Sequence, residues 1–198
     1  MRLRLTLAAL AILLAACSTG GPSRGTAPQI DALAASIRAT DPAIDPSEAQ
    51  RAARLAYDYS YQLARQYRIT DPPLIHNAKV NAGLRPRGLC YHWAEDMERR
   101  LDAEGFATLE MQRAIANSES LFLIEHSTAV ITPKGAPMSA GIVLDPWRKG
   151  GTLFWSPVGD DKRYAWVPRE TVLKRKGQIR YVQRNAGSLA PLPADFDE

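Results

Sequence analysis

Residues 90–111 read CYHWAEDMERRLDAEGFATLEM, and the hydrophobic period changes within this stretch. Before Gly105 the apolar residues recur at three- and four-residue intervals, as on one face of a helix, at Ala94, Met97 and Leu101. Glycine commonly ends a helix. Beyond it, apolar and polar residues alternate through Ala107, Leu109 and Met111, which is typical of a half-buried strand. We therefore expect a helix from Cys90 to about Glu104, followed by sheet.

The flanking sequence extends this division. On the N-terminal side, residues 31–40 are Ala-rich, and residues 48–68 have an apolar helical face, with Ser47 as the expected cap and Asp71-Pro72-Pro73 as the expected end. On the C-terminal side, apolar runs bounded by turn-forming residues predict strands within residues 121–131, 141–144, 152–155 and 164–167. Helices followed by an antiparallel sheet indicate one α+β domain, which we expect to span residues 30–190.

The first 17 residues have the pattern of an export signal. Two arginines precede an apolar run, Leu5 to Ala16, that is shorter than the roughly 20 residues needed to span a bilayer. Leu14-Ala15-Ala16-Cys17 resembles the lipobox of bacterial lipoproteins. The resemblance implies a signal peptide over 1–16, acyl chains on Cys17 that bind the lipid bilayer, and a cell-envelope location. Ser18, where many inner-membrane lipoproteins have Asp, favours the outer membrane, facing the periplasm.

Composition separates the ends from the domain and excludes several functions. Residues 17–29 are rich in Gly, Ser, Pro and Thr and predict a flexible tether, and we expect 191–198 to be a frayed tail. Removing 1–16 lowers the formal net charge from +4 to +2, and no basic cluster with interleaved aromatics indicates nucleic acid. We expect Lys174 to Lys176 to form a solvated turn or to guard a sheet edge. No metal-ligand spacing or phosphate loop appears, so we expect no cofactor.

Cys90 is the one cysteine left when Cys17 is committed to lipid. A lone cysteine in an oxidising compartment is either buried and inert or retained for its thiol chemistry. Cys90 follows Gly88-Leu89 at the expected start of a helix, where free amides and the helix dipole stabilise an anion and favour a thiolate.

A thiolate nucleophile needs a general acid and a residue that orients it. Of the three histidines, His92 is two positions from Cys90 and points away from it on a helix, and His76 is expected in a surface loop. His126 instead interrupts the apolar strand at 121–131, and Asp145 ends the apolar run that follows. Two adjacent antiparallel strands, joined through residues 132–140, would place His126 and Asp145 side by side.

These residues also resemble a known family. Gly88-Leu89-Cys90-Tyr91-His92-Trp93-Ala94 is similar to the nucleophile motif of the transglutaminase-like superfamily, and Leu144-Asp145-Pro146-Trp147 is similar to its Asp motif. The order Cys, His, Asp is also that of the family. The resemblance implies a papain-like α+β fold with Cys90 as nucleophile, His126 as general acid and base, and Asp145 as orienter.

The resemblance covers roughly residues 88–155 and implies a cysteine peptidase or amidase that acts on a peptide, a protein or peptidoglycan. Leu89 stands at the position where animal transglutaminases have Gln, and no site for an amine acceptor is evident. We therefore expect hydrolysis of the acyl-enzyme rather than transfer of the acyl group to an amine. The Cys90 amide would serve the oxyanion hole, with Asn77 or Asn81 as a second donor. The alternative is a catalytically inactive papain-fold envelope module that binds a peptide, peptidoglycan or a partner protein. Glu95 and Asp96 are expected on a solvated helix face, and the tryptophans either in the core or lining a cleft, at positions Trp93, Trp147, Trp155 and Trp166.

Overall fold

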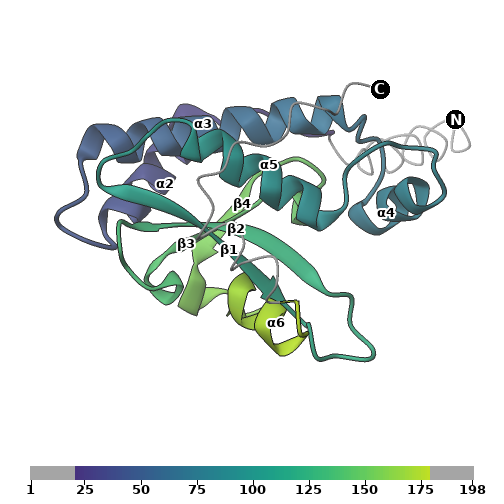
Figure 1. The fold of residues 1–198 in the computed structure, drawn as a ribbon. Coiled ribbons are helices and arrows are strands. Elements are labelled where there is room, and N and C mark those ends of the chain that lie inside the picture. Colours follow the sequence, from purple (N-terminus) through teal and green to yellow (C-terminus); the bar gives the residue numbers. More distant parts are fainter. Residues whose placement is uncertain (1–20, 179–198) are drawn as a thin grey trace, which may run out of the picture.

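The computed structural model describes residues 21–178 (Figure 1). The predicted signal peptide 1–16, Cys17, the first residues of the predicted tether and the predicted tail 191–198 lie outside the described residues. Within the described part, the helices are α2 (Ala27–Arg38), α3 (Pro46–Gln66), α4 (Pro73–Asn81), α5 (Cys90–Asp102) and α6 (Arg169–Arg175). The strands are β1 (Leu109–Ala116), β2 (His126–Pro133), β3 (Ile142–Asp145), β4 (Phe154–Pro157) and β5 (Val167–Pro168). None of the helices in residues 21–178 is both long and apolar enough to cross a membrane.

The five strands form one sheet in the order β4-β3-β2-β1-β5, with every neighbouring pair antiparallel. Helices α2, α3 and α5 pack over one face of it, as Figure 1 shows. Met97 and Leu101 of α5 are fully buried there against the apolar side chains of β2 and β3. A smaller cluster, with Val130 and Val143 at its centre, covers the opposite face. The predicted α+β class, with helices preceding an antiparallel sheet, is confirmed.

The predicted helices were largely correct, but several of their boundaries differ. Helix α2 begins at Ala27, inside the segment predicted to be tether, because Thr26 and Gln29 form a capping box. Helix α3 is capped by Asp45, whose side chain accepts from the Ser47 and Glu48 amides, and not by Ser47. Helix α4 was not predicted, because Pro72-Pro73 was interpreted only as a helix end, whereas proline is also tolerated in the first turn of a helix. The run Lys174 to Lys176 ends helix α6.

The strand prediction was wrong for Leu121 to Glu125. This apolar run has no regular structure, and its first two side chains, Leu121 and Phe122, are 93% and 95% exposed. Strand β2 begins only at His126, which is the first residue paired with β1. The last strand is also shorter than predicted, since β5 holds only Val167 and Pro168. The hydrophobicity of Leu121 to Ile124 predicted burial, but these four side chains lie on the surface.

Glu48 joins the helices to the sheet. Its carboxylate, near the start of α3, accepts hydrogen bonds from the Ala107 amide at 2.7 Å, the Thr108 amide at 2.8 Å and the Thr108 hydroxyl at 2.6 Å. Burial works against the charged carboxylate, but these hydrogen bonds outweigh it and lower the pKa of Glu48 below its usual 4.5. The three bonds therefore fix the chain where it leaves α5 for β1.

We predict that Glu48→Gln lowers the free energy of unfolding by about 2 kcal/mol at pH 7, because two backbone amides lose a charged acceptor. The pKa of Glu48 is lowered on folding, so its contribution is present above pH 4.5 and is lost as the pH falls below that value. Urea unfolding from pH 3 to pH 7 measures both effects. The control is Glu170→Gln, which removes an exposed ion pair with Lys174 and should change little. Equal losses in the two variants would contradict the assigned role.

Candidate active site

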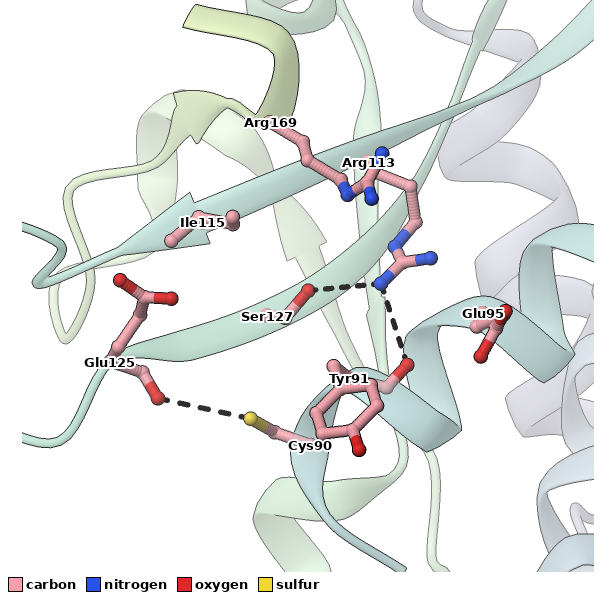
Figure 2. A pocket seen from close by; sticks show the side chains of 8 residues that line it. All are labelled: Cys90, Tyr91, Glu95, Arg113, Ile115, Glu125, Ser127 and Arg169. Carbon is pink, nitrogen blue, oxygen red and sulfur yellow. Dashed lines mark hydrogen bonds between the residues drawn. The ribbon is translucent and has the colours of Figure 1, made fainter. Parts of the chain in front are cut away.

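Cys90 is the first residue of α5 and is partly exposed. Its Sγ lies 3.8 Å from the carbonyl oxygen of Glu125, immediately before β2 (Figure 2). The preceding loop is held by His92, whose Nδ1 accepts hydrogen bonds from the amides of Gly88 and Leu89, both at 3.2 Å. His92 therefore acts as an acceptor for the amides ahead of the helix.

Gly88 is required for this loop. Its φ is +127°, a conformation that L side chains rarely adopt, and an added Cβ would lie 2.3 Å from Nε2 of His76. The same nitrogen bonds the carbonyl of Arg87 at 3.0 Å. His76 is thus a buried residue of α4, only 1% exposed, and the prediction of a surface loop for it was wrong. It locks α4 against the loop that carries Cys90.

The structure brings His126 and Asp145 together. The pairing of Ala129 with Leu144 places Asp145 opposite Thr128, two residues along β2 from His126 and on the same side of the sheet. His126 Nε2 donates to Asp145 Oδ2 at 2.7 Å, and both side chains are almost fully buried. Strand pairing, rather than any local motif, therefore creates this contact.

Asp145 belongs to a larger charged network. Its carboxylate also accepts from the backbone amide and the Nε of Arg148, both at 3.1 Å. The same guanidinium makes two bonds to Asp161, at 2.6 and 3.1 Å, and Asp161 accepts from Trp166 Nε1 at 2.9 Å. With His126 protonated, the two cations and two carboxylates sum to zero charge. Such pairing is what allows charges to be buried.

Aromatic rings enclose the imidazole. The ring centroids of Trp147, Tyr164 and Trp166 lie 4.6, 4.7 and 5.4 Å from that of His126. Arg148 lies over the Phe154 ring, 3.8 Å from its centroid. These rings exclude water from the network and fix the plane of the imidazole. Two of the four tryptophans, Trp147 and Trp166, thus belong to the site, whereas Trp93 is in the core and Trp155 bonds the Tyr57 hydroxyl.

The chemistry of His126 follows from these contacts. Burial opposes the charged ring, but the Asp145 carboxylate and then the Cys90 thiol outweigh it and raise the pKa of His126 to about 9. Its second nitrogen, Nδ1, is buried and has no hydrogen-bond partner among residues 21–178. An imidazolium with one N–H bound to a carboxylate therefore keeps its other N–H free.

Two cavities open beside these residues. One, of about 410 Å³, is lined by Cys90 together with charged side chains, among them Arg113 and Arg169 (Figure 2). The other, of about 790 Å³, is lined by His126 and Trp147 and by the exposed apolar residues Leu74, Ile75 and Phe122–Ile124. The thiol and the imidazole each line a different cavity, so small molecules can approach the site from a polar and from an apolar side.

Other predicted site residues lie elsewhere. Asn77 accepts from Trp147 Nε1 at 3.1 Å, which ties it to the residue whose ring packs on His126, and Asn81 is an exposed residue at the end of α4. The prediction that Asp96 is solvated was wrong, because it is 5% exposed and bonds the Tyr67 hydroxyl and Arg87. Among residues 21–178, no group of three or more His, Cys, Asp or Glu side chains is placed to hold a metal ion.

Sequence reasoning missed Arg148, Asp161 and Tyr164. Arg148 follows Asp145 by three residues, a spacing at which one turn of helix brings two side chains together. This contact could therefore have been predicted from the local sequence. Asp161 and Tyr164 had no such local signal, since they lie in an irregular segment whose path depends on tertiary packing.

We predict that Gly88→Ala lowers the free energy of unfolding by at least about 3 kcal/mol, since it adds a steric clash with His76 to an unfavourable backbone conformation. Gly83 is the matched control: its φ is +72° and nothing lies within 4 Å of an added Cβ, so Gly83→Ala should cost only about 1 kcal/mol. Urea unfolding of both variants tests the difference. Similar costs would show that the contact with His76 is not tight.

The site thus combines a helix-start thiol, a buried imidazolium and a carboxylate held by an arginine. Comparisons of the chain with protein-family models, with curated protein sequences and with solved structures gave no match. The function of this site therefore rests on its own geometry and chemistry.

Proposed function

We propose that this protein is a cysteine hydrolase that cleaves amide bonds with Cys90 as nucleophile, His126 as general acid and base, and Asp145 as orienting residue. The observation that carries the proposal is the buried hydrogen bond from His126 to Asp145, at 2.7 Å, next to the thiol: the Cys90 Sγ lies 3.8 Å from the carbonyl oxygen of Glu125, the residue before His126. His76 also has a buried nitrogen without a partner among residues 21–178, so the bond to Asp145 is what distinguishes His126.

The charges favour an ion pair at the start of the reaction. A pKa of about 9 keeps His126 protonated at neutral pH, and an imidazolium stabilises a neighbouring thiolate. The N-terminus of α5 acts in the same direction, because its unpaired amides and dipole favour an anion at Cys90. The nucleophile and the acid would thus be prepared together before the substrate binds.

In the first step the Cys90 sulfur bonds to the carbonyl carbon of the amide. His126 then passes its Nδ1 proton to the departing nitrogen, the C–N bond breaks and an amine leaves. Water, deprotonated by the now neutral His126, attacks the thioester and releases a carboxylic acid. The thiolate and the imidazolium are restored. Asp145 holds the ring throughout by accepting from Nε2.

The oxyanion of the tetrahedral intermediate would face the start of α5. His92 satisfies the amides of Gly88 and Leu89, while the Cys90 amide has no acceptor among the described residues, which leaves it for the oxyanion. Asn77, held beside the site by Trp147, is better placed for a second donor than Asn81.

The finer fold and family are part of the same proposal. A nucleophile at the start of a helix that packs on the sheet, with histidine and aspartate from adjacent antiparallel strands, is consistent with a papain-like fold and with the transglutaminase-like superfamily. Leu89 and the absence of an evident acceptor site favour hydrolysis over transfer.

A second candidate is a non-catalytic envelope module that binds a peptide, peptidoglycan or a partner protein. The exposed apolar run Leu121–Ile124 beside the larger cavity favours it, since exposed apolar patches commonly mark interaction sites. In such a module Cys90 would be an ordinary thiol, and this difference separates the two functions.

We predict that His126→Gln lowers the rate at which iodoacetamide alkylates Cys90 at pH 7 at least tenfold, because the thiolate loses its cationic partner. Mass spectrometry of the tryptic peptide Gly88–Arg99 measures this rate separately from that of Cys17. The advantage of the wild type should decline as the pH rises through about 9, where the imidazolium is lost.

The urea-unfolded chain supplies the reference rate for an unactivated thiol, and Ser127→Ala is the matched control, because it alters the wall of the same cavity without removing a charge. Equal alkylation rates in wild type, His126→Gln and the unfolded chain would contradict the enzyme proposal and favour the binding module.

We also propose that the domain is held on the outer membrane by acyl chains on Cys17, on the basis of residues 1–18 alone. In a bacterial host, Cys17→Ser should move the protein from the membrane pellet to the soluble fraction and abolish labelling by radioactive palmitate. Wild-type and variant protein found in the same fraction, both unlabelled, would refute the anchor.

A further inference from the structure

The cavity that contains Cys90 has an uneven charge distribution. Four charged side chains line it: Glu95, Arg113, Glu125 and Arg169. The two carboxylates are paired with cations that do not line the cavity, Glu125 with Lys176 and Glu95 with Arg87 at 3.8 Å. The negative charges of the two lining carboxylates are therefore already paired with cations outside the cavity. The guanidinium groups of Arg113 and Arg169 then determine the electrostatic potential inside it.

Arg113 is fixed in the wall of this cavity. Its Nη1 lies 3.2 Å from Glu98, and its Nη2 donates to the Ser127 hydroxyl at 3.2 Å and to the Tyr91 carbonyl at 3.4 Å. Its Nε is buried and has no hydrogen-bond partner in the described part of the chain. These contacts hold the guanidinium between α5 and β2.

Arg169 makes no direct ion pair in the described part of the chain. Figure 2 shows its side chain reaching along β1 toward Arg113, above Ser127 and the thiol. No carboxylate of residues 21–178 lies within 4.0 Å of it, and it is exposed at the cavity rim. Glu98 pairs directly with Arg113 and interacts with Arg169 only at longer range, so the guanidinium of Arg169 keeps its donors free for a ligand in the cavity.

We propose that Arg169, with Arg113 behind it, binds a carboxylate of the substrate on the polar side of Cys90. Guanidinium groups suit this ligand because their planar donors match the two oxygens of a carboxylate. Calling the ligand a substrate rests on the proposed hydrolase function. In that case the scissile amide would belong to an amino-acid or peptide derivative that bears a carboxylate close to that bond. Binding of the anion itself depends only on the cavity.

Two alkylating reagents of similar size test the site, because Cys90 lies in the same cavity. The sulfur displaces iodide from either reagent, but iodoacetate carries a carboxylate and iodoacetamide is neutral. In the full-length protein we expect the ratio of the iodoacetate rate to the iodoacetamide rate at Cys90 to exceed that of the urea-unfolded chain. Arg169→Gln should lower the ratio by roughly threefold or more and leave the iodoacetamide rate within about twofold of wild type.

Arg175→Gln is the matched control, since it removes the same charge from the same helix at a residue that pairs with Glu119 and does not line the cavity. An unchanged ratio in Arg169→Gln, or an equal fall in Arg175→Gln, would overturn the proposal. His126→Gln separates this test from that of the hydrolase, because loss of the imidazolium slows both reagents. If Arg169→Gln lowers the ratio of the two rates while His126→Gln changes neither rate, the anion site would be supported and the hydrolase function would be contradicted.

Protection experiments identify the source of the carboxylate. N-acetyl-dialanine, its C-terminal amide and N-acetyl-Ala-Glu-Ala-amide would each be tested for slowing the reaction of Cys90 with iodoacetamide. Protection by the free acid alone assigns the site to a chain end, and protection by the glutamate peptide assigns it to an acidic side chain. Either effect should be lost in Arg169→Gln. Equal protection by the neutral amide, or protection by none of the three, would contradict carboxylate recognition.

Discussion

The hydrogen bond between His126 and Asp145 is the interaction on which the site depends, and Arg148 and Asp161 make its burial tolerable. An isolated carboxylate inside the protein would cost several kcal/mol, so Asp145 needs partners on both sides. The imidazolium is one and the guanidinium is the other. Because the second carboxylate balances the second cation, the group of four carries no net charge, and three aromatic rings enclose its histidine.

The remainder of the fold brings the thiol to this network. Helix α5 packs across the sheet, so its first residue lies beside the end of β2 where His126 begins the strand. Gly88 allows the loop before α5 to pass close to His76, and Glu48 fixes the chain between α5 and β1. Residues from several separate segments thus position one sulfur atom, and Cys90, His126 and Asp145 carry the bond-making and proton-transfer steps of the proposed chemistry.

The sequence was informative where local pattern and fold agree. The face of α5, the order of helices and strands and the meeting of His126 with Asp145 could all be predicted, because helical periodicity and strand alternation follow from burial. Leu121–Ile124 was mispredicted, since its hydrophobicity is not matched by burial. Asp161 and Tyr164, which contact Arg148, could not be predicted, because they lie in an irregular segment. The position of such a segment depends on tertiary contacts and not on a periodic sequence pattern.

The chain has three histidines, and each ring is buried at a different structural junction. His76 lies between α4 and the loop before α5, His92 accepts the amides at the helix start, and His126 joins two strands. The imidazole resonances of this protein are therefore natural reporters for nuclear magnetic resonance. Each can follow the ordering of one junction without any introduced label.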